Sequence, residues 1–120
     1  MSIPMPVSEI ADRYSICLLK QERTTENLDE ELALYEKELK NYPNVMEFVD
    51  LLYDINGKIW DLESDIRMGR EGELGFEEVG RRAIKIRDLN KNRIAIKNMI
   101  VKEYNEGFMD IKVNHASDDK

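Results

Sequence analysis

Three polar side chains with binding potential lie in a segment where a hydrophobic core is expected. Between Phe76 and Tyr104, one helix face carries Phe76, Val79, Ala83, Ile86, Asn90, Arg93, Lys97 and Ile100, at spacings of three and four. Asn90, Arg93 and Lys97 therefore interrupt an apolar stripe. Burial of such groups without partners is costly, so we expect partners from other helices or from a ligand.

A second stripe changes from apolar to polar in the same way. It consists of Val49, Tyr53, Asn56, Trp60, Glu63 and Arg67. An indole face and amide edges suit a nucleobase, and guanidinium and ammonium groups suit a phosphate. We therefore predict a non-catalytic binding protein that holds a small anionic ligand, such as a nucleotide derivative, between helices. The predicted site residues are Asp12, Lys20, Asn56, Trp60, Glu63, Arg67, Asn90, Arg93 and Lys97.

A purely structural role explains the same polar residues. Arg93 and Lys97 would pair with Glu63, Asp12 or Glu22, and Asn90 would bond Asn56. Such a network fixes the register of packed helices without binding anything. The protein would then be a helical oligomerisation or adaptor protein.

An enzyme is the third alternative. Glu26-x-x-Asp29 and Glu47-x-x-Asp50 loosely resemble the paired acidic motifs of all-α nucleoside triphosphate pyrophosphohydrolases, whose carboxylates hold magnesium. The single histidine lies in a polar tail and the single cysteine among apolar residues, which excludes histidine-based triads and histidine-containing zinc sites. We predict no catalytic residue, no metal ligand and no cofactor.

The apolar periodicity predicts an all-α fold of four helices. Their expected bounds are residues 9–23 with Ser8 as N-cap, residues 28–41 after an Asn27 cap, residues 45–67 and residues 76–104. The last two should form a long antiparallel hairpin with the first two packed along it. Asn56-Gly57 is a hairpin signal for strands, but the helical spacing of apolar residues continues across it, so we expect a continuous helix. Residues 1–107 are predicted to be one domain and 108–120 a partly disordered tail.

Charge and hydropathy limit the partners. The net charge of −7 argues against general nucleic-acid binding, although residues 76–104 carry eight bases and four acids. No apolar run approaches the length of a membrane span, and the N-terminus has no signal-peptide pattern, so we expect a cytoplasmic protein. Helices this long leave apolar surface uncovered in a monomer. We therefore expect a homo-oligomer with Ile94 to Val101 and Phe108 to Val113 at its interface.

Four groups of residues, taken together and in order, suggest a resemblance. They are Pro6-Val7-Ser8 with Asp12-Arg13 and Ile16; Lys20 with Glu22-Arg23; Asn56, Trp60, Glu63 and Arg67; and Asn90, Arg93 and Lys97. This ordered set resembles a domain-of-unknown-function family of small all-helical bacterial and phage proteins, over about residues 5–100. The resemblance implies a helical fold and marks these positions as family-like, but it implies no activity. In a phage protein, sequestration of a host nucleotide signal would suit such a site.

Overall fold

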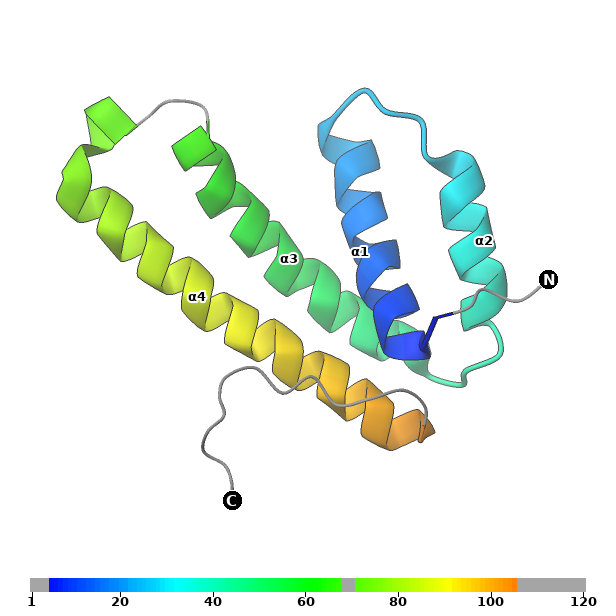
Figure 1. Ribbon diagram of the computed structural model, residues 1–120. Coiled ribbons are helices and arrows are strands. Elements are labelled where there is room, and N and C mark those ends of the chain that lie inside the picture. Colours follow the sequence, from blue (N-terminus) through cyan, green and yellow to red (C-terminus); the bar gives the residue numbers. More distant parts are fainter. Residues whose placement is uncertain (1–4, 68–70, 106–120) are drawn as a thin grey trace, which may run out of the picture.

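The computed structural model describes residues 5–67 and 71–105, and at 67 and 71–74 it describes the backbone alone. In these residues all the regular structure is helical. In order the helices are α1 (Val7–Arg23), α2 (Asp29–Leu39), α3 (Val45–Arg67) and α4 (Glu71–Tyr104). The last two run side by side as a hairpin, α1 crosses this hairpin and contacts both of its helices, and α2 packs on α1 (Figure 1). The predicted all-α, four-helix fold is confirmed. The second helix packs mainly on the first, however, and not along the hairpin.

The start of α1 differs from the prediction. The helix begins at Val7, because the Pro6 carbonyl oxygen accepts bonds from the backbone N–H groups of Glu9 (3.0 Å) and Ile10 (3.1 Å). Proline has a fixed φ and no N–H group, which suits it to a position just before a helix. Ser8 is therefore buried inside the first turn and does not act as the N-cap.

The next two helices lie close to where the sequence places them, but Asn27 is not the N-cap of α2. That helix begins at Asp29, and Leu28 holds the N-cap position without a side-chain hydrogen bond. Asn27 Oδ1 accepts a bond from the Asp29 backbone N–H at 3.0 Å, an Asx turn that leads into α2. This helix ends at Leu39, two residues before the expected end. The next helix has the predicted bounds and passes through Asn56 and Gly57 without a break. The helical spacing of its apolar residues has therefore overridden the local hairpin signal.

One glycine divides α4. Gly75 has φ 82° and ψ 159°, which is not helical, so continuous helix begins at Phe76 as predicted. Glycine accepts such a conformation without the steric penalty that a Cβ would bring. At its other end the helix is held by Tyr104, whose ring meets that of Tyr42 edge-on at 5.3 Å and whose hydroxyl donates to the Pro43 carbonyl at 2.5 Å.

The hydrophobic core lies where α1 crosses the hairpin. It is formed by Val7, Ile10, Ala11, Tyr14 and Cys17 of α1, Leu32, Tyr35 and Leu39 of α2, Val45, Val49 and Leu52 of α3, and Ile96 and Ile100 of α4. Ile96, Ile100 and Val101 are thus buried within one chain, whereas Met99 of the same stretch is 48% exposed. The expected oligomer stays a prediction. The other part of its expected interface, Phe108 to Val113, lies outside the described residues, as does the predicted tail.

Candidate functional site

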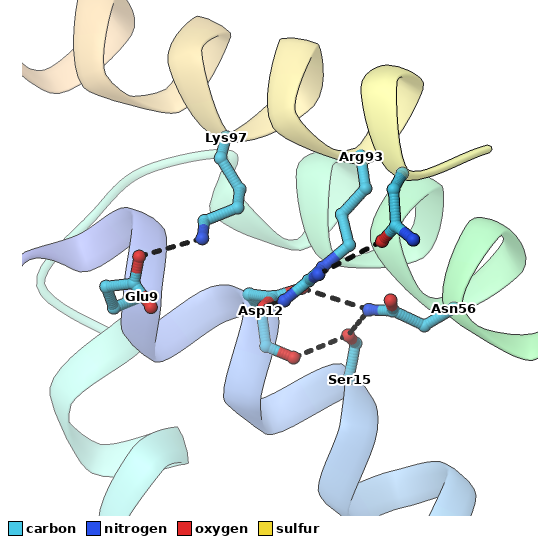
Figure 2. Close-up of polar contacts among 7 residues, drawn as sticks. Glu9, Asp12, Ser15, Asn56, Arg93 and Lys97 are labelled. Carbon is cyan, nitrogen blue, oxygen red and sulfur yellow. Dashed lines mark hydrogen bonds and ion pairs between the residues drawn. The ribbon is translucent and has the colours of Figure 1, made fainter. Parts of the chain in front are cut away.

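A buried carboxylate joins three helices. Asp12 of α1, only 2% exposed, accepts hydrogen bonds from Arg93 Nε to Oδ1 (3.0 Å) and from Arg93 Nη2 to Oδ2 (2.5 Å), which makes a bidentate ion pair with α4. Asn56 of α3 donates from Nδ2 to the same Oδ1 (3.0 Å) and to Ser15 Oγ (2.9 Å). Figure 2 shows these side chains converging from the three helices. The contacts fix how α1 sits across the hairpin.

The ionisation of Asp12 follows from these neighbours. Burial alone would raise the pKa of this carboxyl, but hydrogen bonds from Arg93 and Asn56, with the charges of Arg93 and Lys97, outweigh burial and lower the pKa below its ordinary value. A lowered pKa means that the folded state favours the charged form. The resulting stabilisation is present above the ordinary aspartate pKa and is lost as the pH falls through the lowered value.

The partners of the other cluster residues differ from those expected. Lys97 Nζ pairs with Glu9 Oε2 at 2.8 Å, an acid not considered from sequence, and its charge also acts on Asp12. Asn90 Oδ1 accepts from Arg93 Nη1 at 3.3 Å, whereas Asn56 bonds Asp12 and Ser15 and not Asn90. Of the expected pairs, that between Arg93 and Asp12 is present. The polar cluster is therefore tied mainly to α1.

A hollow of about 270 Å³ opens beside this network. Its lining consists of Ile16 and Leu19 from α1, Asn56, Ile59, Trp60 and Glu63 from α3, and Asn90 and Arg93 from α4. Five of the nine predicted site residues thus share one concave surface. Because the volume is slightly below the roughly 300–1,000 Å³ of typical small-molecule sites, it suits a ligand of about the size of a nucleobase or nucleoside.

One acceptor in this lining has no partner among the described residues. Asn56 uses Nδ2 to donate to Asp12 and to Ser15, and no described group donates to its Oδ1, although the residue is 7% exposed. Buried carbonyl oxygens are usually hydrogen-bonded. Asn56 Oδ1 is therefore an acceptor for a ligand or a water molecule in the hollow.

The remaining predicted site residues lie elsewhere. Lys20 and Asp12 line a second hollow of about 300 Å³ with Arg13, Glu31 and Tyr35, and this hollow shares Ile16 and Arg93 with the first. Lys97 lines neither of the two. The side chain of Arg67 is outside the described residues. Within the described lining, the first hollow thus offers one cation, Arg93, and one carboxylate, Glu63, which is a smaller positive charge than the sequence predicted.

The acidic pairs of the enzyme alternative do not converge. Glu26 and Asp29 lie at the start of α2, and Glu47 and Asp50 lie just beyond its other end, in the first turns of α3 (Figure 1). Among the described residues, no group of three or more histidine, cysteine or carboxylate side chains is arranged to hold a metal ion. Cys17 is a weak nucleophile, because burial and a hydrogen bond with Glu31 raise the pKa of its thiol to about 11.

Two contributors to the network were missed from sequence. Ser15 lies three residues after Asp12 on α1, and Glu9 three residues before it. All three therefore lie on one helix face, which is the signal that could have identified them. Once Asp12 is known to be buried, helical spacing points to both residues. The sequence alone does not show that Asp12 is buried.

Comparisons with protein-family models, with curated proteins and with solved structures found no match to this chain. The family resemblance noted from the sequence therefore stays a prediction. Within the described ranges, none of the helices has the length and apolar character needed to cross a membrane.

Proposed function

We propose that this protein binds a small anionic ligand, such as a nucleotide derivative, in the hollow between α1, α3 and α4, without catalysing its conversion. The observation that carries the proposal is the convergence of Asn56, Trp60, Glu63, Asn90 and Arg93 on one concave surface. These residues come from two helices and were selected from the sequence for their chemistry alone. Packing without a binding role does not require an indole, two amides, a guanidinium and a carboxylate around one hollow.

The lining suggests how such a ligand would be held. A planar ring would lie against Trp60, and its amino groups would donate to Asn56 Oδ1 or Glu63. An anionic group would face Arg93, whose side chain is 28% exposed. Because Asp12 already accepts two bonds from this guanidinium, the site favours a single anionic group over a triphosphate. Asp12 and Asn90 would hold Arg93 in position before the ligand arrives.

Trp60 offers a direct test, because it is the only tryptophan of the chain. Its fluorescence should change on titration with the matching member of a panel of mono-, di- and cyclic nucleotides, and calorimetry should give the same dissociation constant. Trp60→Ala should weaken binding by about 1–3 kcal/mol, the usual contribution of one base stacked on an aromatic ring. Met46→Ala, a change at an exposed residue that lines another hollow, is the matched control and should bind normally.

The contrary result is specific. The hollow is not a nucleotide site if no nucleotide of the panel binds at millimolar concentration, or if a nucleotide binds but Trp60→Ala and Asn90→Ala leave its affinity unchanged. Lys97→Met provides a further check, because Lys97 does not line the hollow. This variant should lower the melting temperature through loss of its pair with Glu9 and leave binding unaltered.

A second candidate function is a helical assembly protein in which the polar network is purely structural. The closed Asp12–Arg93 ion pair favours it, because a guanidinium committed to a buried carboxylate stabilises the fold without a ligand. Arg93→Met distinguishes the two functions. In an assembly protein it would change the melting temperature alone, whereas in a binding protein the nucleotide affinity would fall as well.

A further inference from the structure

The far end of the helical hairpin is not covered by any other described helix. We call this part the arm and define it as residues 60–66 of α3 and 76–92 of α4. No described residue in either stretch is buried, whereas the buried residues of the two helices all lie in 45–59 and 96–101. The first helix ends at Arg23, which pairs with Asp61 at the base of the arm. Figure 1 shows the arm standing apart from α1 and α2.

The arm carries apolar side chains that two helices cannot bury alone. Leu62 and Ile66 of α3 and Val79, Ile86 and Leu89 of α4 are only partly buried. Ile84 is 52% exposed and Phe76 is 94% exposed. A helix is stabilised mainly by burial of its apolar face against other elements, and a helix pair has too few neighbours for this. The radius of gyration, 16.2 Å, compares with about 14 Å for a compact domain of this length and agrees with a protruding arm.

The arm has an acidic helix and a basic helix, so two identical arms can attract each other. Residues 60–66 contain three acids, Asp61, Glu63 and Asp65, and no base. Residues 76–92 contain five bases and three acids. The two helices already attract each other within one chain, as the 2.7 Å pair between Arg82 and Asp65 shows. A two-fold axis would place the basic helix of one copy against the acidic helix of the other, twice.

We propose that the arms of two copies of this chain pack together about a two-fold axis and form a four-helix bundle. The partly buried side chains Leu62, Ile66, Val79, Ile86 and Leu89 make the centre of this bundle, and the charged residues make its rim. A second copy fits this surface better than an unlike protein, because both signs of charge needed for the contact are present on the same arm. The arm includes Trp60, Glu63 and Asn90 of the hollow, but the apolar side chains at the centre of the bundle do not line it. Variants of those apolar residues therefore test the dimer apart from the ligand site.

The test is sedimentation of the full chain between 1 and ~100 μM, concentrations that bracket a micromolar dimer. The wild type should show a concentration-dependent dimer. Ile86→Glu and Val79→Ser should each raise the dimer dissociation constant at least about tenfold, because a charge or a polar group replaces an apolar contact at the centre of the bundle. Leu34→Glu is the matched control, since Leu34 is 58% exposed on α2, away from the arm. Circular dichroism should show the same helix content in all four proteins.

Two results would overturn the proposal. The first is a wild type that stays monomeric over the whole range, which would leave the arm to an unlike partner or to solvent. The second is a dimer that both arm variants leave intact, or that Leu34→Glu disrupts equally, since the contact would then lie elsewhere. High salt supplies a further readout, because screening of the complementary charges should weaken this dimer.

Discussion

At the scale of single residues, Asp12 has the largest structural consequence. It is nearly inaccessible to solvent, which alone would raise its pKa, yet the pKa is lowered because Arg93 and Asn56 donate hydrogen bonds and Arg93 and Lys97 supply positive charge. A carboxylate in this position links α1 to α3 and α4 at one point. The same contacts hold Asn56 and Arg93 in the wall of the hollow, so the side chains that connect the helices also line the candidate site.

Loss of Arg93 from this ion pair should lower the free energy of unfolding more than loss of Asp12. Arg93→Met leaves a buried carboxylate without its main counter-charge, and we expect the free energy of unfolding to fall by roughly 3–5 kcal/mol. Asp12→Ala should cost less, because the Arg93 side chain is 28% exposed and can turn to water. Denaturant unfolding of both single variants and the double variant measures the coupling.

The exposed pair of Lys58 and Asp54 on α3 is the matched control. Lys58→Met should change the stability by no more than about 0.5 kcal/mol, as surface pairs do. If Arg93→Met cost no more than Lys58→Met, the buried pair would have no special structural role.

Sequence reasoning found most of the site but not how its parts are connected. Asn90 and Arg93 stood out because polar residues interrupted an apolar stripe, and Trp60 because it followed Asn56 on a second stripe. The partner of Lys97 could not be predicted. Many acids were available, and the choice among them depends on the angle at which α1 crosses the hairpin, which is a tertiary property.

At the scale of helices, the surroundings of each glycine show whether packing against another helix explains its presence. Gly57 lies buried in α3, where a glycine costs about 1 kcal/mol relative to alanine and would be explained by close approach of another backbone. The nearest atoms to an added Cβ are instead side-chain atoms, Leu19 Cδ2 at 3.6 Å and Arg23 Nη2 at 3.5 Å, both at ordinary contact distance. Gly57 therefore has room for a methyl group, and close backbone approach does not explain it.

Two other glycines give a sharper prediction, because an added Cβ at either has no neighbour within 4 Å. Gly80 lies inside continuous helix, so Gly80→Ala should raise the free energy of unfolding by roughly 0.5–1 kcal/mol through helix propensity. Gly75 has a positive φ, so Gly75→Ala should destabilise the protein by roughly 1–2 kcal/mol through steric strain. Paired denaturant curves measure both changes, and equal signs would contradict the break in α4 at Gly75.

The helices themselves were predictable because their signals are local. Helical spacing of apolar residues located α3 with both ends correct and located the start of continuous helix at Phe76. Tertiary packing was less predictable. We expected apolar surface at the Ile94 to Val101 stretch because the last helix is longer than the helices that pack on it. Ile96, Ile100 and Val101 are instead buried where α1 crosses the hairpin, although Met99 is 48% exposed. The opposite end of the hairpin is the part left uncovered.

At the scale of the whole molecule, we expect local stability to differ between the arm and the rest of the helical structure, which we call the base. The base contains every described buried residue of α3 and α4, together with the ion pair of Asp12 and Arg93. The arm has only partly buried apolar contacts and salt bridges that include Arg82 with Asp65. Regions with few buried contacts open locally at a lower free energy than the global unfolding of a domain.

Amide hydrogen exchange should therefore be faster in the arm than in the base. At about 1 μM protein, we expect residues 61–66 and 77–91 to exchange at least roughly tenfold faster than residues 49–56 and 96–101, which flank the core. Residues 7–19 of α1 serve as an internal reference with constant protection. If two arms pair, raising the concentration to ~100 μM should slow exchange in the arm alone, because dimerisation stabilises the closed form by mass action. Uniform protection at both concentrations would contradict this division and would mean that the hairpin opens as one unit with the core.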